Sequence, residues 1–109
     1  MNRATIAIIE RVAKYHNVTL QRTSDWGITE KSILDFENSD INWGYVSRHF
    51  TLNEEFMEMF QTKLYWVYIS QYQKLSEKFI RKYLSKLDIN LIINCQKRGY
   101  KFRFLLPFK

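Results

Sequence analysis

The chain has 109 residues, of which 46% are hydrophobic, 26% charged and 17% aromatic, which predicts one folded domain and excludes a disordered tail or a multidomain enzyme. Only three Gly and one Pro are present, so a collagenous chain and a sheet protein built on many tight turns are excluded, and helix is favoured. The net charge of +6 is polarised: residues 1–62 carry six Lys or Arg and nine acidic residues, whereas residues 63–109 carry eleven and two. A basic half predicts an acidic partner, either a nucleic acid or an acidic protein face.

Cysteine usage and hydropathy indicate where the protein resides. The single cysteine, Cys95, excludes an internal disulfide, and Glu10 and Arg11 interrupt the apolar run near the N-terminus, so we expect no signal peptide. No apolar stretch approaches the roughly 20 residues that span a bilayer. We therefore expect an intracellular protein of the cytoplasm that does not bind a membrane.

The first segment, residues 1–24, is predicted to form a helix and an extended stretch. Between positions 4 and 16 the apolar side chains recur at helical spacing, which predicts an N-terminal helix. Residues 18–22 then favour a strand or an extended segment.

The centre of the chain, residues 25–95, repeats itself with a period of 23 residues. When residues 42–64 are aligned with residues 65–87, eight positions are identical: Trp43 with Trp66, Tyr45 with Tyr68, Ser47 with Ser70, Leu52 with Leu75, Glu54 with Glu77, Phe56 with Phe79, Lys63 with Lys86 and Leu64 with Leu87. A weaker copy precedes these units from Ile28, and a decayed copy follows them from Ile89. Terminal copies are expected to degenerate because their outer faces meet water or a cap.

Each repeat is predicted to fold as two short helices. A broad apolar face runs from Leu75 to Leu87, and a shorter segment before it places Trp66 and Ile69 three residues apart. The expected fold class is therefore mainly α, made of small stacked helical repeats of two short helices with 23 residues in each repeat.

The start of the second helix carries a capping signal. Thr51-Leu-Asn-Glu54 has the form of a capping box, which predicts that Thr51 is the N-cap residue and that Glu54 is the third helical residue. Glu30 and Glu77 hold the equivalent position in the neighbouring copies, where a carboxylate also suits the positive end of the helix dipole.

The last segment, residues 96–109, is basic and aromatic. From Tyr100 to Phe104 rings and cations alternate, which is typical of a strand, and Gly99 allows a turn before them. Two interpretations stay open: a minor β pairing with residues 18–22, and an extended cap over the last helix.

The best-preserved unit resembles a known repeat. Residues 66–80 read W-V-Y-I-S-Q-Y-Q-K-L-S-E-K-F-I and resemble the tandem W-x-x-I-S-x-x-Q-x-L-S-E-x-F-I units of proteins from phages and large DNA viruses. Residues 41–95 carry the match, although Phe50 stands where the next unit has Gln73 and Asn53 stands where it has Ser76. The resemblance implies a viral or mobile-element protein built of small helical repeats, and it supports no catalytic assignment.

Residue types that bind metals or catalyse reactions are scattered. His16 and His49 are distant in sequence from each other and from Cys95, without zinc-site spacing, and Cys95 lies in an apolar segment as a small hydrophobe does. The three glycines are isolated and form no phosphate loop. The carboxylates of residues 35–40 more often keep a loop soluble than hold Mg²⁺. We therefore expect no catalytic residue, no metal site and no cofactor.

A basic stripe is expected along the helix that follows Leu75. Its candidate phosphate-contacting residues are Lys74, Lys78, Arg81 and Lys82, with Lys97 added from the last segment. Stacking of successive repeats would alternatively bring Glu55 and Glu58 towards Lys78 and Arg81, which would make the stripe an internal ladder of ion pairs. Both interpretations stay open.

Candidate partner-binding residues combine cations with rings, because Tyr and Arg are favoured anchors of interfaces. They are Arg98, Lys101, Arg103 and the exposed faces of Tyr68 and Tyr72. One hypothesis is a non-catalytic protein-interaction module, a small phage or viral inhibitor that binds a host protein or ribonucleoprotein complex, as anti-CRISPR proteins do. The alternative is a nucleic-acid-binding protein that uses the basic and aromatic C-terminal segment. The sequence leaves the oligomeric state open.

Overall fold

A computed structural model describes residues 1–95 and, within them, the side chains as far as Ile93. Seven α-helices follow one another in this range: α1 (Arg3–Tyr15), α2 (Glu30–Asn38), α3 (Trp43–His49), α4 (Glu54–Met59), α5 (Trp66–Tyr72), α6 (Glu77–Lys82) and α7 (Ile89–Cys95). The predicted mainly α class is confirmed. The predictions for residues 96–109, including Lys97, Arg98, Lys101 and Arg103, lie outside the described residues, as does the side chain of Cys95.

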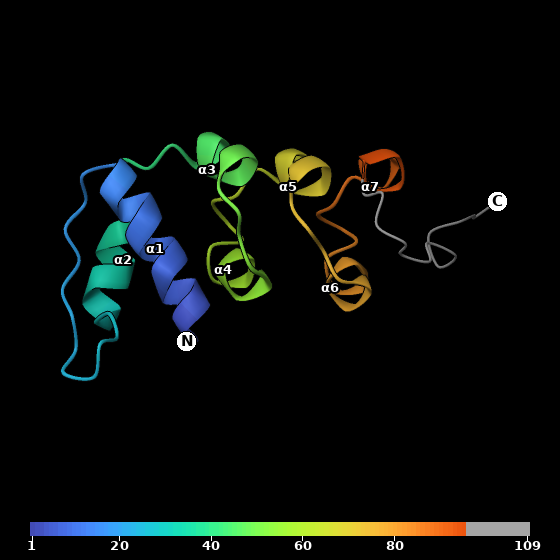
Figure 1. The fold of residues 1–109 in the computed structure, drawn as a ribbon. Coiled ribbons are helices and arrows are strands. Elements are labelled where there is room, and N and C mark those ends of the chain that lie inside the picture. The colour runs from blue at the N-terminus through green and yellow to red at the C-terminus, as the bar shows by residue number, and fades with distance from the viewer. Residues whose placement is uncertain (96–109) are drawn as a thin grey trace.

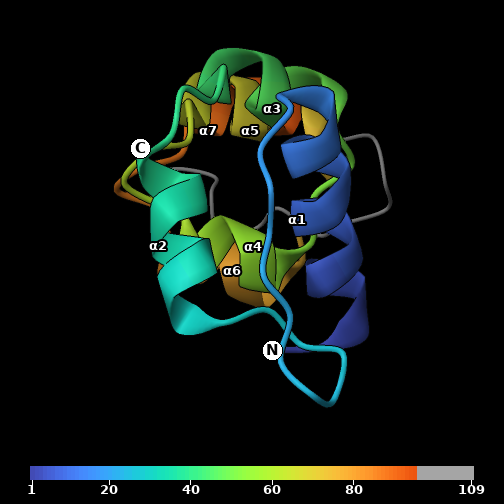
Figure 2. The same cartoon turned by 90° about the vertical axis from the view of Figure 1, so that its left-hand side faces the viewer.

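The short helices alternate between two layers (Figure 1). Figure 2 looks along the stack and shows α3, α5 and α7 behind one another in one layer, with α4 and α6 in the other. Helix α5 packs against both α3 and α7, while α1 packs against α4 and stands with α2 at the N-terminal end. This is the stacked repeat that the 23-residue period predicts, since α3 with α4 and α5 with α6 form successive two-helix units.

The second helix of each unit begins later in the chain than the capping box predicts. Asn53 caps α4 and accepts a hydrogen bond from the backbone N–H of Phe56 at 2.9 Å, so the predicted cap at Thr51 is wrong. Glu54 is consequently the first helical residue and not the third. Asn is a stronger N-cap than Thr, which explains the choice between two nearby candidates. The equivalent cap residues of α2 and α6 are Thr29 and Ser76, so Glu30 and Glu77 also open their helices.

The second helix also ends earlier than its apolar pattern indicates. Helix α6 stops at Lys82, and residues 83–87 form a turn and a bend. Tyr83 and Leu87 are nevertheless buried, so the apolar face serves the core without being one helix. The chain needs this turn because it must cross to the other layer before α7 begins.

Large rings fill the interior between the layers. The fully buried rings of Phe36, Phe56 and Phe60 surround Trp43, which is 8% exposed. In the next unit Trp66 is half-buried, stacks against Phe79 and Tyr83, and donates its indole N–H to the carbonyl of Gln61 at 2.9 Å. Both tryptophans therefore pack inwards, as the repeat alignment predicts.

A buried serine joins each unit to the next. The hydroxyl of Ser47 donates to the carbonyl of Trp43 at 2.7 Å and accepts the backbone N–H of Tyr65, just before α5, at 3.0 Å. Ser70 repeats this arrangement: it donates to the carbonyl of Trp66 and accepts the backbone N–H of Asp88, each at 2.8 Å. We call these two contacts the serine joints. They account for the identity of Ser47 and Ser70 in the repeat.

Residues 18–22 form an extended segment and no named strand. The backbone bridge at Arg22 is to Ile28, and Thr29 donates its backbone N–H to the carbonyl of Gln21 at 3.0 Å. In the described residues this segment therefore pairs with the chain that follows it directly. No helix in the described part of the chain is long and apolar enough to cross a membrane.

Candidate interaction surface

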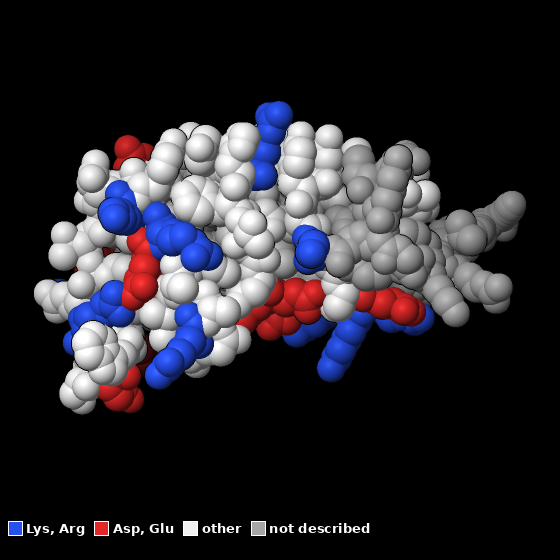
Figure 3. All heavy atoms as spheres, in the orientation of Figure 1, with Lys and Arg blue, Asp and Glu red and all other residues white. Residues whose placement is uncertain are grey.

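Charge separates the two helical layers. Helices α3, α5 and α7 contain no acidic residue, and their one Lys or Arg is Arg48. Helices α4 and α6 contain four glutamates, at positions 54, 55, 58 and 77. Figure 3 shows the result: acidic and basic groups crowd the side of α4 and α6, whereas the surface over α3 and α5 is largely uncharged. The layer of α3 and α5 therefore presents aromatic rings and polar groups, and no carboxylates, to a binding partner.

Five tyrosines and one arginine cover this layer and the adjoining end of α1. We call them the tyrosine face: Tyr15, Tyr45, Arg48, Tyr65, Tyr68 and Tyr72. Tyr15 and Tyr65 are each 55% exposed and Tyr72 is 45% exposed, so much of their ring surface meets solvent. A group of exposed large rings is more informative than a single exposed apolar residue, because contiguous apolar patches mark interaction sites.

Rings on the tyrosine face support one another. Tyr15 stacks on Tyr45 with ring centroids 4.9 Å apart, and Tyr65 stacks on Tyr68 at 6.1 Å. Hydrogen bonding to the Tyr45 side chain, with a further contribution from desolvation, raises the pKa of Tyr15 above its ordinary value of 10.0. The Tyr15 hydroxyl therefore stays protonated at neutral pH and remains a hydrogen-bonding group on this face.

Arg48 connects the two units on this face. Its guanidinium lies 5.2 Å from the ring centroid of Tyr72 and 5.8 Å from that of Tyr68, both within the range of cation–π attraction. No carboxylate of the described residues forms an ion pair with it. Two shallow hollows share Arg48 and His49 in their walls, one towards Tyr65 and the other towards Lys74. An anionic group of a partner can therefore reach this guanidinium between rings.

Of the partner-binding residues predicted from sequence, the structure brings Tyr68 and Tyr72 together on one face. Arg48 lies beside them and was not among the residues predicted from the sequence. The 23-residue period pairs position 48 with Gln71, so the repeat itself gives no reason to select it. One available signal was that the segments forming α3 and α5 contain no acidic residue. Arg48 is consequently the only Lys, Arg, Asp or Glu in helices α3, α5 and α7.

The basic stripe is partly neutralised. Lys82 pairs with Glu58 of the preceding unit at 2.9 Å, and Arg81 pairs with Glu77 of its own helix at 2.8 Å. Hydrogen bonding to Glu58, and then its charge, raises the pKa of Lys82. An ion pair between units therefore exists, as one of the two interpretations expected. Lys74 and Lys78 are exposed to solvent.

The predicted pairing of Glu55 and Glu58 with Lys78 and Arg81 is wrong. Glu58 meets Lys82 and not Lys78 or Arg81, while Glu55 turns to α1, where its carboxylate accepts hydrogen bonds from the Thr5 hydroxyl and, at 3.0 Å, from the backbone N–H of Asn2. The reason is that α1 occupies the side of α4 on which Glu55 lies.

A loop between α1 and α2 presents a single exposed ring. Trp26 is 80% exposed and has a φ of 72°, a left-handed conformation that is rare for a bulky residue. Thr23 holds the loop, because its hydroxyl accepts the backbone N–H of Gly27 at 2.9 Å and donates to the carboxylate of Asp25. The hydrogen bond from the Thr23 hydroxyl is the main cause of the lowered pKa of the Asp25 carboxyl group. The loop is therefore closed by its own hydrogen bonds and carries a negative charge at Asp25.

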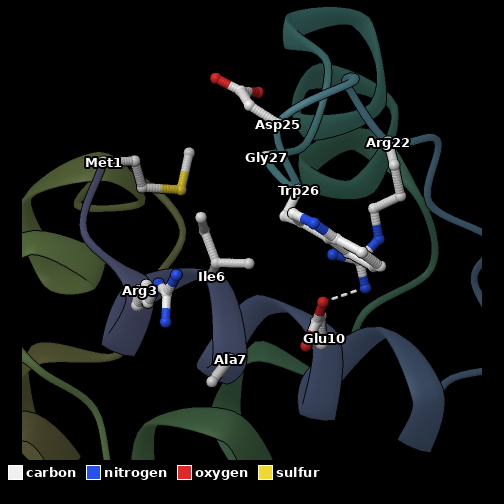
Figure 4. A pocket seen from close by; sticks show the side chains of 9 residues that line it. All are labelled: Met1, Arg3, Ile6, Ala7, Glu10, Arg22, Asp25, Trp26 and Gly27. Atoms are coloured by element: carbon white, nitrogen blue, oxygen red, sulfur yellow. Dashed lines mark ion pairs between the residues drawn. The ribbon is translucent and has the colours of Figure 1, made fainter.

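The hollow under this loop has charges of both signs. Figure 4 shows Trp26 beside Arg22, whose guanidinium pairs with Glu10 of α1. Arg3 and the apolar side chains of Met1, Ile6 and Ala7 complete the wall. With two carboxylates in this wall, the hollow is less suited to an anionic ligand than the tyrosine face.

Neither surface contains the residues of a metal centre. In the described range, no group of three or more His, Cys, Asp or Glu side chains could hold a metal ion. Comparison of the chain with protein-family models, with curated proteins and with solved structures gives no match.

Proposed function

We propose that this chain is a non-catalytic protein-interaction module that docks through the tyrosine face. The observation that carries the proposal is the group of exposed and half-buried tyrosines around Arg48 on a layer without acidic residues. Tyrosine offers a large contact area at a small cost in conformational entropy, and arginine adds a directed charge. A partner with an acidic or hydrogen-bonding surface fits this face.

The scaffold supports such a role because it holds the rings in register. The serine joints tie the start of α5 to α3 and the start of α7 to α5 through buried hydroxyl groups. A surface that is ordered before binding loses less entropy when the partner arrives. Stacked repeats commonly use an extended face in this way.

Resemblance of residues 66–80 to phage and viral repeat units supports a narrower form of the proposal. A small inhibitor that occupies a host defence or nucleic-acid-handling complex needs a docking surface and no catalytic site. The tyrosine face supplies such a surface. Under this proposal the protein acts in the cytoplasm of the host cell.

Nucleic-acid binding is the second candidate, because the tyrosine face contains no acidic residue to repel phosphates. Tyrosines can stack on bases, and Arg48 can contact a phosphate. Protein docking is preferred because the face carries a single arginine, and affinity for nucleic acid depends on neutralising several phosphates. Binding to random single-stranded DNA and RNA should separate the two, since phosphate-driven affinity falls steeply between 50 and 200 mM salt.

Site-specific photocrosslinking in the cells where the protein naturally occurs tests the proposal. A photoreactive residue replaces Tyr72 on the tyrosine face or Leu34, which is 57% exposed on α2, as the matched control. We expect a protein adduct at position 72 that resists nuclease and is lost when Arg48→Glu is added, and no such adduct at position 34. Equal adducts at both positions, or an adduct at position 72 that nuclease removes, would contradict protein docking.

A further inference from the structure

His16 takes the place of the repeat serine at the N-terminal end of the stack. Its Nε2 accepts the backbone N–H of Asn42, just before α3, at 3.1 Å, and its Nδ1 lies 2.8 Å from the carbonyl of Val12. In the serine joints the hydroxyl likewise bonds the carbonyl four residues earlier and accepts the N–H that precedes the next helix of the layer. One imidazole thus makes both contacts of a serine joint between α1 and α3.

These two contacts fix the protonation state of the ring. A carbonyl oxygen can only accept, so the nitrogen beside Val12 must carry a proton. A backbone N–H can only donate, so the nitrogen beside Asn42 must present its lone pair. The joint therefore requires neutral His16 in the Nδ1–H form, whereas imidazolium has two donors and no acceptor. A serine hydroxyl keeps both roles at any pH near neutrality.

We propose that His16 is a proton-operated joint between the N-terminal helix pair and the repeat stack. Histidine is the side chain whose charge ordinarily changes between about pH 5 and 8. Protonation keeps the bond to the Val12 carbonyl and suits the negative end of the α1 dipole, but it places a second donor against the N–H of Asn42. The proton thus favours His16 as a cap of α1 and disconnects it from α3.

Within residues 1–95, few ionisable side chains neighbour the joint. Tyr15 meets the His16 ring edge-on with centroids 5.0 Å apart. Along the chain, Lys14 lies on α1 and Asp40 lies two residues before Asn42. Helix α3 contributes Tyr45, which stacks on Tyr15, and His49, whose ring lies tilted against Tyr45 with centroids 4.4 Å apart. No described carboxylate forms an ion pair with His16, so the acceptor role of Nε2 depends on the neutral ring alone.

Under the proposed function, the joint controls docking at that same face. Tyr15 adjoins His16 in the chain and enters the tyrosine face by stacking on Tyr45. Separation of α1 from α3 would displace this end of the face, so we expect weaker docking in mild acid. Only this consequence rests on the proposed function, because the joint itself can be measured on the free protein.

Two NMR measurements on the ¹⁵N-labelled protein test the joint. Long-range ¹H–¹⁵N spectra at pH 7.5 should show His16 protonated at Nδ1 and bare at Nε2. Between pH 7.5 and 5.0, amide exchange at Asn42, divided by the intrinsic rate, should lose about three- to tenfold in protection, as expected for one lost hydrogen bond. The amides of Tyr65 and Asp88, held by serines, serve as internal controls and should keep their protection.

Two substitutions distinguish the effect of His16 on the Asn42 amide from that of His49. His16→Ala should give low protection of Asn42 at both pH values, whereas His49→Gln should leave the wild-type response intact. A neutral ring protonated at Nε2, or a parallel response of the Asn42, Tyr65 and Asp88 amides, would overturn the joint whether or not His16→Ala folds. If the joint is present and photocrosslinking at Tyr72 fails, the proposed function alone is refuted.

Discussion

The side-chain carbonyl of Gln73 accepts the backbone N–H of Leu52 at 2.9 Å, although the two residues lie 21 positions apart. The side-chain nitrogen of Gln73 donates at the same time to the carbonyls of Ser47 and Phe50, at 2.9 and 2.7 Å. A single buried amide therefore satisfies three backbone groups, one near the end of α3 and two on the connection from α3 to α4. Buried backbone groups need such partners, which makes this side chain part of the fold as much as an apolar residue.

Gln73→Leu should destabilise the protein strongly, because it keeps the volume and leaves three backbone groups without a partner. Each unsatisfied buried group costs about 1–3 kcal/mol, so we expect a loss of about 3 kcal/mol or more in the free energy of unfolding. Urea titration measures the change. Gln71→Leu, at a half-buried position of α5, is the matched control, and equal stability of the two variants would show that the amide network is unimportant.

Removal of a serine joint should have a smaller, local effect. Ser47→Ala takes away one donor and leaves the backbone N–H of Tyr65 without its acceptor, which should cost about 1–3 kcal/mol. Amide exchange should rise first at Tyr65. Ser85→Ala, in an exposed turn, should change neither quantity; a Ser47→Ala variant that behaves like Ser85→Ala would contradict the assigned role.

The three tryptophans should differ in their contribution to stability. Trp43→Ala should cost about 3–5 kcal/mol because the ring is buried. Trp66→Ala should cost less, since its ring is half-buried. Trp26→Gly should change stability by less than about 1 kcal/mol, because relief of the left-handed backbone offsets the greater freedom of glycine in the unfolded chain. Thermal or urea unfolding of the three variants gives the order, and a costly Trp26→Gly would show that the indole supports the fold.

The contact between α1 and α4 should weaken in acid. Hydrogen bonds from Thr5 and then from the backbone of Asn2 lower the pKa of Glu55 below its ordinary value of 4.5. Because the folded state holds the carboxylate in its charged form, its stabilising effect is present above pH 4.5 and is lost as the pH falls through the lowered value.

Glu55→Gln should therefore show a smaller fall in Tm between pH 7 and pH 3 than the wild type. Asp25, whose pKa is also lowered, is present in both proteins and cancels from the comparison. Differential scanning calorimetry at several pH values measures the two curves, and parallel curves would contradict a role for the Glu55 carboxylate.

Much of this architecture can be predicted from the sequence because identical side chains make the same contacts in two successive units. Trp43 and Trp66, or Ser47 and Ser70, recur after 23 residues since each pair makes equivalent contacts. Helix starts were harder to predict, because Thr51 and Asn53 both suit an N-cap position and the stronger cap, Asn53, begins α4.

Contacts between units were the least predictable part. Arg48 meets Tyr68 and Tyr72 because of the register between α3 and α5, which no local pattern specifies. Glu54 provides a second example: its carboxylate accepts the backbone N–H of Ser76 at 2.8 Å, in the next unit, where the local motif predicted a bond within its own helix.

Because each serine joint closes its polar groups within one 23-residue step, the stack has a natural unit of growth. Suppose that a copy of residues 65–87 were inserted in frame after Leu87. The first backbone N–H of the copy would donate to the serine of the preceding unit, and the serine of the copy would accept the first N–H of the following unit. Gene duplication or deletion at this interval could lengthen or shorten the protein without exposing unmatched backbone. Its reach along a partner would then change in whole steps, one row of rings at a time.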